Sequence, residues 1–355
     1  MEMFELMAEG EHEQLVLWSE PRFGYKGIIS LHDTSLGPGL GGTRFWNYKT
    51  ESEALVDALR LARGMTYKAA VTGLALGGGK SVIWGDPRVS GVEREMVFRA
   101  HGRAVESLGG RYITAEDVNT SPADMAFIAL ETDHVVGLEG TSGDPSPVTA
   151  YGVYRGIKAA AMARYGDDAL GGKHIAVQGL GSVGYHLCED LAGEGARLSV
   201  ADIDTGRVDR VVKQFGAQAV PPDVIFDVDA DIFAPCALGA VVNDETIPRL
   251  KVDIVAGAAN NQLQNTAKHG PALLEAGILY APDYVLNAGG LINVYGELQG
   301  WSLEQSLQKT GEIYDTLLRI FTLAEGEGVS PEEAASRLAE ERIEHGRHLH
   351  RTFLS

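Results

Sequence analysis

Two lysines in the N-terminal half of the sequence stand in surroundings that are unusual for a residue normally solvated at a protein surface. Lys80 follows the glycines 77–79 and precedes the apolar stretch 81–84, which predicts a buried strand. The run 72–80 holds too many glycines for a regular element, and glycines would let a substrate contact the backbone. A lysine in a partly desolvated pocket there would have its pKa lowered toward neutrality, which suits a general base.

Two other charged residues could reach the same place. Apolar residues at helical spacing over 52–68 predict a helix that carries Lys68 at its C-terminal end, just before the glycine-rich run. Asp117 follows a strand predicted over 112–114 and could supply a carboxylate. A turn or helix-capping role for Asp117 is an equal alternative, because Ser121-Pro122 is a typical helix start.

A G-x-G-x-x-G motif occurs in the C-terminal half. It consists of Gly179, Leu180, Gly181, Ser182, Val183 and Gly184. Alone the motif is weak evidence, but here an apolar strand runs into it, a helix leaves it and the next strand ends at Asp202. Such glycines admit a pyrophosphate to the helix N-terminus, and the acidic residue accepts hydrogen bonds from ribose hydroxyls. A tight turn without a ligand is the weaker alternative.

The residues after Asp202 indicate which dinucleotide would bind. Ile203 and Asp204 follow, with no basic residue beside them. A 2′-phosphate would meet two carboxylates, so the sequence favours NAD over NADP.

Hydrophobic patterning predicts the elements that would position these groups. The first third should contain strands at 15–18, 27–31, 81–84 and 112–114 and helices at 52–68 and 92–107. Later we predict helices at 149–164, 183–191, 302–324 and 331–351 and strands at 174–178, 198–201, 232–234, 254–256 and 284–286. Strands that alternate with helices favour an α/β fold with a parallel sheet.

The best candidate for a domain boundary is the stretch 137–147, where glycine and proline crowd a short polar segment. It predicts two domains around a deep cleft: an N-terminal α/β domain, 1–140, and a Rossmann-type dinucleotide-binding domain, 141–330. We expect the C-terminal helix 331–355 to pack back on the first domain.

Composition excludes several classes of protein. The net charge of −19 repels nucleic acids and anionic membranes, so neither is an expected partner. Neither a secretory signal nor a run long enough for a membrane span is apparent. Two cysteines cannot build a disulfide framework, which favours the cytoplasm, and we expect no metal site.

Short motifs along nearly the whole chain resemble those of the glutamate/leucine/phenylalanine/valine dehydrogenases. They are LGPGLGGTR at 36–44, RGMTYK at 63–68, GGGK at 77–80, TAED at 114–117, APCA at 234–237, AANNQ at 258–262 and NAGG at 287–290. Together they are highly specific, and they are most similar to those of the leucine-specific members. The stretch 287–295 is similar to tryptophan-specific ones.

The resemblance implies reversible, NAD-dependent deamination of an L-amino acid to its 2-oxo acid and ammonia. It implies that Lys68 binds the substrate carboxylate, that Lys80 activates the water attacking the imino intermediate, and that Asp117 exchanges protons with the amino group. Further contacts to the substrate backbone would come from Gly41, Gly42 and Asn261. Thr149, Asn260 and Asn287 would line the nicotinamide end of the cofactor site. The first domain would also mediate assembly into a homo-oligomer, an octamer or a dimer.

The residues expected in the substrate pocket do not all indicate the same class of substrate. Its wall would comprise Leu40, Ala115, Val136, Leu291 and Val294. Glutamate-specific relatives have a lysine at the position of Leu40, so glutamate is not expected here. Ala115 resembles leucine-type enzymes, whereas Leu291 resembles phenylalanine- and tryptophan-type ones. A branched aliphatic substrate is our first choice and an aromatic one the alternative, although Ala115 and Val136 could equally be plain core residues.

Two other classes of protein are weaker interpretations. A non-catalytic nucleotide sensor would be expected to lack Lys80 or Asp117. A hydroxy-acid dehydrogenase would use a histidine as acid and base. None of the residues in the family-like site is a histidine, and His345, His348 and His350 crowd the C-terminal tail.

Overall fold

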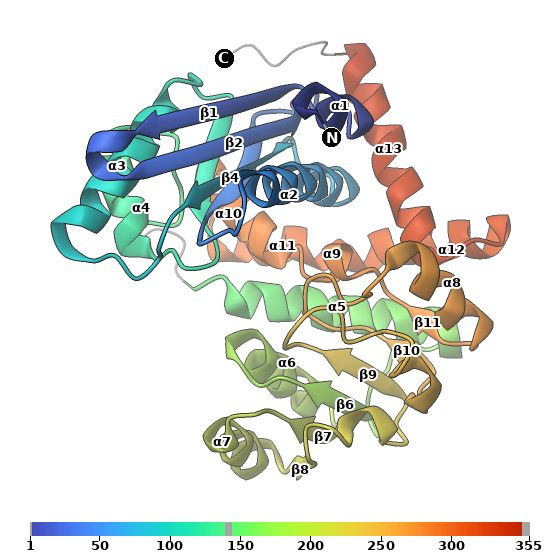
Figure 1. Ribbon diagram of the computed structural model, residues 1–355. Coiled ribbons are helices and arrows are strands. Elements are labelled where there is room, and N and C mark those ends of the chain that lie inside the picture. Colours follow the sequence, from blue (N-terminus) through green and yellow to red (C-terminus); the bar gives the residue numbers. More distant parts are fainter. Residues whose placement is uncertain (1, 139–143, 350–355) are drawn as a thin grey trace. The chain divides into compact units, whose positions relative to one another are not determined.

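The computed structural model describes residues 2–138 and 144–349 (Figure 1). The predicted boundary between 140 and 141 and the last residues of the predicted C-terminal helix lie outside these ranges. Unit 1 comprises the described residues of 1–143, 297–300 and 339–355, and unit 2 comprises 144–296 and 301–338. None of the helices in the described ranges is long and apolar enough to cross a membrane.

Unit 1 is built on a mixed sheet in the order β1-β2-β4-β3-β5. The strands are β1 (Gln14–Glu20), β2 (Tyr25–Asp33), β3 (Gly39–Trp46), β4 (Gly77–Trp84) and β5 (Tyr112–Glu116). β2 pairs antiparallel with β1 and β4, whereas β3 runs parallel to β4 and β5 on either side of it. The C-terminal ends of β3, β4 and β5 therefore meet at one edge of the sheet.

Helices cover both faces of this sheet. They are α1 (Met3–Glu9), α2 (Glu51–Val71), α3 (Gly91–Glu106) and α4 (Pro122–Ala129), with the short 3-10 turn η1 (Pro21–Phe23). α2 buries Ala58 and Leu59 in a cluster with Val82 of β4. On the opposite face Phe98 of α3 stacks edge-on against Phe45 of β3, with ring centroids 5.8 Å apart. α2 lies mainly over β2 and β4 and leaves the neighbouring part of β3 less covered.

The last helix, α13 (Pro331–Leu349), is capped by Ser330, whose Oγ accepts a hydrogen bond from Glu333 N at 3.3 Å. Within unit 1 it is held by arginines. Arg342 donates to the carbonyl oxygens of Ala70 and Leu74, at 2.8 and 3.0 Å. Arg347 Nε lies 2.8 Å from Asp33 Oδ2, whose side chain is buried.

The glycines before Lys80 belong to β4, so the prediction of an irregular segment is wrong for 77–80. Gly78 pairs with Leu40 of β3, and Lys80 pairs with Ser30 of β2. A Cβ on Gly78 would lie 2.3 Å from Ala62 O of α2, and one on Gly77 would lie 2.2 Å from Asp33 O. The glycines are needed because the protein's own backbone approaches this strand closely, a reason the sequence pattern did not reveal.

Unit 2 contains the expected parallel sheet, in the order β11-β10-β9-β6-β7-β8. The strands are β6 (His174–Gln178), β7 (Arg197–Ala201), β8 (Gln218–Ala219), β9 (Ile232–Pro235), β10 (Ile254–Val255) and β11 (Leu279–Tyr280). The helices are α5 (Ser146–Tyr165), α6 (Ser182–Gly193), α7 (Thr205–Phe215), α8 (Thr266–Glu275), α9 (Asp283–Leu286), α10 (Gly289–Gln299), α11 (Leu303–Gly311) and α12 (Ile313–Glu327), with the turns η2 (Ile225–Asp227) and η3 (Ile247–Arg249). The predicted two-domain α/β fold with a Rossmann-type sheet is confirmed.

Two predicted elements of unit 2 are wrong. The stretch 284–286 forms the short helix α9, in which Leu286 N donates to Pro282 O, and the edge strand lies earlier, at β11. An apolar run of this length does not distinguish a strand from a helical turn. The helix predicted over 302–324 is divided into α11 and α12 at Glu312, whose N–H bonds only three residues back, to Lys309 O.

Candidate active site

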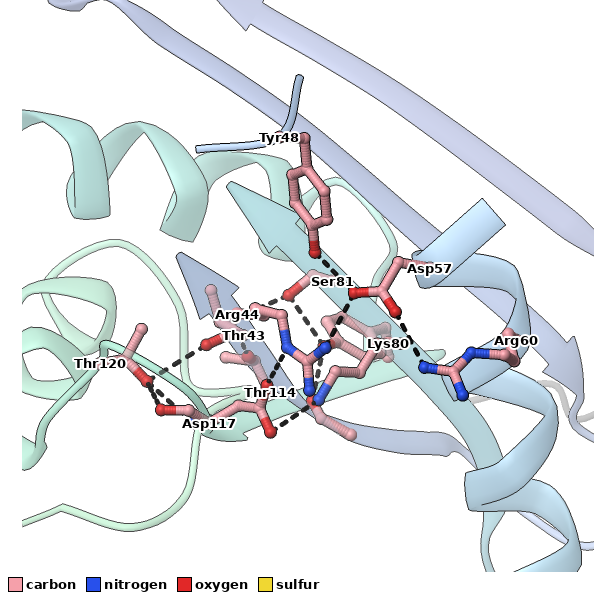
Figure 2. Close-up of polar contacts among 12 residues, drawn as sticks. Thr43, Arg44, Tyr48, Asp57, Arg60, Lys80, Ser81, Thr114, Asp117 and Thr120 are labelled. Carbon is pink, nitrogen blue, oxygen red and sulfur yellow. Dashed lines mark hydrogen bonds and ion pairs between the residues drawn. The ribbon is translucent and has the colours of Figure 1, made fainter. Parts of the chain in front are cut away.

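Lys80 and Asp117 form an ion pair in unit 1, in which the lysine is buried and the aspartate is partly buried. Lys80 Nζ lies 3.1 Å from Asp117 Oδ1, and the lysine residue is only 5% exposed (Figure 2). Asp117 follows the last residue of β5, so its carboxylate stands at the C-terminal edge of the sheet. In the strands the neighbours Ser81 and Thr43 point the other way, toward His101 of α3. Lys80 therefore faces the side of the sheet that α2 partly covers.

The pair is electrostatically tuned. Burial lowers the pKa of Lys80, which outweighs the opposite effect of Asp117. Burial would raise the pKa of Asp117, but the charges of Lys80 and Arg44 hold it below its ordinary value. Asp117 thus stays ionised, while the amine gives up its proton more easily than an exposed lysine does, which is the property that a general base requires.

Asp117 does not cap the helix that follows it. Ser121, and not Asp117, caps α4, and Asp117 N–H donates to Thr120 Oγ1 at 2.8 Å within a tight turn. Both carboxylate oxygens are instead occupied by cations, Lys80 on one side and Arg44 on the other. The side chain is therefore held beside Lys80 and is not used for capping.

The glycines of β3 permit this arrangement. Lys80 and Asp117 come from β4 and β5, which flank β3. A Cβ on Gly42 would lie 2.8 Å from Asp117 Cβ and 2.2 Å from Glu116 O, and one on Gly41 would lie 1.8 Å from Gly79 O. Any larger residue at either position would push the neighbouring strands apart. The two predicted substrate glycines thus have a packing role that does not depend on a ligand.

The other predicted site residues of unit 1 lie on or next to the same strands and on α2. Leu40 is buried on β3, where it pairs with Ile113 of β5, and Ala115 pairs with Gly42. Val136 is also buried and donates its N–H to Thr114 O at 2.9 Å. Lys68 lies in the last turn of α2, as predicted.

The G-x-G-x-x-G segment of unit 2 has the shape of a phosphate-binding turn. Gly179 has φ +96°, and a Cβ on it would lie 2.6 Å from Ala237 Cβ; one on Gly184 would lie 2.0 Å from Gly179 O. α6 begins at Ser182 without a side chain to cap its first N–H groups. Leu180 N donates to Asp202 Oδ2 at 2.6 Å, which ties the turn to the end of β7. Glycines, free helix N–H groups and an acidic residue at the next strand fit a dinucleotide.

A basic residue does lie near the acidic pair, on α7. Arg207 Nε is 3.4 Å from Asp204 Oδ2, and Arg207 Nη1 is 4.0 Å from Asp202 Oδ2. Ile203, between the two aspartates, is exposed. The helix turn between 204 and 207 brings the arginine back toward the carboxylates, which adjacency in the sequence does not show.

The remaining predicted residues of unit 2 gather in two places. Asn287 Nδ2 donates to Asn260 Oδ1 at 2.8 Å, and the next residue, Asn261, has φ +51°. Thr149 lies in the first turn of α5 and faces the start of α10, because a Cβ on Gly290 would lie 3.1 Å from Thr149 Oγ1. Leu291 and Val294 are separated by three positions on α10 and share one side of it.

Sequence reasoning did not assign a role to Arg44 or Asp57. Arg44 Nε lies 2.8 Å from Asp117 Oδ2, and Arg44 Nη1 lies 2.8 Å from Asp57 Oδ2 (Figure 2). The available signal was that Arg44 is the only charged residue in the stretch 39–46, since such a charge requires partners when it is partly buried.

Comparisons with known proteins agree with this architecture. Residues 19–134 match the family model "Glu/Leu/Phe/Val dehydrogenase, dimerisation domain", and residues 199–344 match "Glutamate/Leucine/Phenylalanine/Valine dehydrogenase". Leucine dehydrogenase of Thermoactinomyces intermedius is 56% identical over 100% of this chain and 97% of its own length. Phenylalanine dehydrogenase of Caldalkalibacillus thermarum is 46% identical over 97% of this chain and 94% of its own.

A solved structure is similarly close. The crystal structure of L-tryptophan dehydrogenase from Nostoc punctiforme has a TM-score of 0.89 and 48% identity, covering 98% of this chain and 100% of that one. The two family models together span most of the chain, and relatives that are 54–56% identical extend over its whole length. The chain belongs to the glutamate/leucine/phenylalanine/valine dehydrogenase family of amino-acid dehydrogenases.

Proposed function

We propose that this protein catalyses the NAD-dependent, reversible oxidative deamination of a branched-chain L-amino acid, with leucine as the first choice. The observation that carries the proposal is the ion pair between the buried Lys80 and Asp117, at 3.1 Å. The same sheet carries the apolar Leu40 at the position where glutamate-specific relatives have a lysine. The presence of both charged residues argues against a non-catalytic nucleotide sensor.

In this proposal three residues of unit 1 have separate roles in binding the substrate and in proton transfer. Deamination passes through an iminium, whose hydration needs a base and whose collapse needs an acid. Lys80, with its lowered pKa, takes a proton from the attacking water at Nζ. Asp117, ionised beside two cations, exchanges a proton with the amino nitrogen through Oδ1 or Oδ2. Lys68 binds the substrate carboxylate as a point charge.

The family's amino-acid dehydrogenases use a nicotinamide dinucleotide, which accepts the hydride from Cα when it is bound. In unit 2 the turn 179–184 would hold the pyrophosphate, including Leu180, Ser182 and Val183 through their backbone, and Asp202 with Ile203 would meet the adenosine ribose. Asp202 and Asp204 would repel a 2′-phosphate, which supports NAD as the specific cofactor. Thr149, Asn260 and Asn287 are proposed for the nicotinamide end.

A branched aliphatic side chain is supported by Leu40 and by the small Ala115 on the neighbouring strand. Five relatives that are 54–56% identical over the full chain are leucine dehydrogenases, whereas the tryptophan and phenylalanine enzymes are 46–49% identical. Leu291 keeps an aromatic substrate as a second candidate. Val136, Val294, Gly41, Gly42 and Asn261 complete the proposed substrate site.

The match of residues 19–134 to a dimerisation domain supports a homo-oligomer, and we propose the cytoplasm as its compartment. The test of the function is a steady-state panel in which each amino acid is oxidised with NAD and formation of the reduced nicotinamide is followed by absorbance. Leucine, isoleucine or valine should give the highest kcat/KM. If tryptophan or phenylalanine is oxidised best, the second candidate holds; if no amino acid is oxidised, the proposal is wrong.

A further inference from the structure

Asp117 has a second cationic partner that lies outside the roles described above. The guanidinium of Arg44 stands between two carboxylates, with Nε 2.8 Å from Asp117 Oδ2 and Nη1 2.8 Å from Asp57 Oδ2 (Figure 2). Because Lys80 Nζ takes Asp117 Oδ1, each oxygen of that carboxylate has its own cation.

Asp57 fixes the far side of the arginine. It projects from α2 and accepts hydrogen bonds from Tyr48 OH at 2.7 Å and Arg60 Nη2 at 3.2 Å as well as from Arg44. The side chains of Arg44, Asp57 and Asp117 are 22%, 16% and 22% exposed. A bridge this little exposed, with two charge-assisted hydrogen bonds from one planar fork, is held in place far more firmly than a surface ion pair.

We propose that Arg44, braced by Asp57, is a positioning residue for the deamination chemistry: it anchors Oδ2 of Asp117 so that Oδ1 stays directed at Lys80. This inference rests on the proposed function. Without Arg44 the carboxylate could rotate about its own side-chain bonds, and the proton-accepting geometry at Oδ1 would be held by Lys80 alone. Small displacements of a catalytic group are costly, about 100-fold in rate for ~1 Å.

The same bridge adjusts the charge around Lys80. The groups that face Lys80 are Asp117 beyond β5, Arg44 on β3 and Asp57 on α2, and α2 also carries Arg60 and Lys68. The charge of Arg44 lowers the pKa of Lys80, whereas those of Asp117 and Asp57 raise it. Arg44 and Asp57 therefore act in opposite directions on the proton affinity of the base, although they support the same geometry.

The opposite effects of Arg44 and Asp57 on the pKa of Lys80 distinguish a positioning role from a merely structural one. In Arg44→Gln, kcat with leucine should fall roughly 10- to 100-fold while KM changes much less. In a plot of kcat/KM against pH, the acid limb should move to higher pH, because Lys80 loses a neighbouring positive charge and its pKa rises. In Asp57→Asn, kcat should also fall, by a smaller factor, but the limb should move to lower pH. Arg44→Lys keeps the charge but loses the planar fork. Its acid limb should therefore lie at the same pH as that of the parent enzyme, while its kcat stays low.

The matched control is Arg88→Gln, because Arg88 pairs with Asp86 at an exposed turn of the same unit. It should leave both kcat and the pH limb unchanged. Equal pH limbs in the parent, Arg44→Gln and Asp57→Asn enzymes, or a full kcat in Arg44→Gln, would overturn the inference. If Arg44→Gln does not fold, as judged by thermal unfolding, Arg44→Lys and Asp57→Asn decide it: both should lower kcat, but only Asp57→Asn should move the acid limb. An unmodified protein without amino-acid oxidation would instead refute the proposed function.

Discussion

Lys80 and Asp117 approach to 3.1 Å across an intervening strand, because β3 lies between β4 and β5 and carries glycine where the two side chains meet. Gly42 is the critical position, since a Cβ there would fall 2.8 Å from Asp117 Cβ. The ion pair therefore depends on a residue that has no functional group.

Replacing Lys80 by alanine tests the proposed base. Lys80→Ala should bind NAD nearly as well as the parent enzyme but should lower kcat by roughly 10²–10⁴-fold, the usual size of a general acid–base contribution. NAD binding is measured by calorimetry and kcat by steady-state kinetics. Lys26→Ala is the matched control, because Lys26 is an exposed lysine near the start of β2, and this variant should keep its kcat. Parental turnover in Lys80→Ala would show that the base lies elsewhere.

Cofactor choice should follow the acidic pair after β7. We expect kcat/KM for NAD to exceed that for NADP by a wide margin, because a 2′-phosphate would meet Asp202 and Asp204. Arg207 is already engaged by both carboxylates, which limits its help to a phosphate. The double change Asp202→Ala with Asp204→Ala should free Arg207 and narrow the preference. Comparable efficiency of the parent enzyme with both cofactors would contradict the prediction and implicate Arg207.

The sequence predicted the elements with strong periodicity and the residues with unusual chemistry. The helix 52–68, the strand before Asp117 and the turn 179–184 were all placed correctly, because each has a pattern that depends on near neighbours. Gly77–Gly79 were assigned to an irregular segment because their reason for being glycine lies in contacts with α2, β2 and Tyr112, which are distant in sequence.

The role of Arg44 was missed for the same physical reason. Its partners, Asp57 and Asp117, lie 13 and 73 positions away along the chain, and nothing in the pattern around the arginine indicates them. The short helix α9 and the break at Glu312 were missed because runs of a few apolar residues fit more than one backbone conformation.

The glycines of β4 provide a stability test. Gly78→Ala should lower the free energy of unfolding by at least about 2 kcal/mol, because the new Cβ would fall 2.3 Å from the backbone of α2. Gly64→Ala is the control: this glycine lies within α2 and nothing stands within 4 Å of its added Cβ. It should raise stability by about 0.5–1 kcal/mol, since alanine favours a helix. Denaturant unfolding measures both, and an equal effect of the two substitutions would contradict the packing argument.

A buried histidine behind the active-site strands should make stability depend on pH. Burial lowers the pKa of His101 from 6.5 to about 3, and its ring contacts Tyr25, Thr43 and Ser81 at 2.7–3.0 Å. Below pH 6.5 the unfolded chain takes up a proton that the native ring does not, so stability present above pH 6.5 is lost as the pH falls. One such group costs about 1.5 kcal/mol between pH 6.5 and 5.

The measurement is the free energy of unfolding at several pH values. His101→Gln should be less stable than the parent at pH 7, since it disturbs the buried hydrogen bonds, but it should lose less stability on acidification. The exposed His348→Gln serves as the control and should follow the parent curve. His32 also has its pKa lowered to about 3 by burial, so part of the acid sensitivity should remain in His101→Gln. Parallel curves for the parent and His101→Gln would refute the assignment.

The last prediction concerns the substrate side chain. Leu40 is 2% exposed and offers only apolar surface. Glutamate-specific members of the family carry a lysine at the matching position. A glutamate side chain buried there would lose its hydration and find no cation, which costs several kcal/mol. We therefore expect good activity on leucine, isoleucine or valine and negligible activity on glutamate.

Leu40→Lys should weaken the apolar substrates, because the new ammonium group would itself be desolvated when they bind. Its kcat/KM for leucine should fall while any activity on glutamate rises, and the ratio of the two values is the quantity to measure. Leu40→Met, which conserves volume and apolarity, is the matched control and should keep the preference for leucine. Because both variants alter the same buried position, a general loss of packing would lower both activities without reversing their order. Glutamate as the best substrate of the unmodified enzyme would overturn the assignment of Leu40 to the pocket wall.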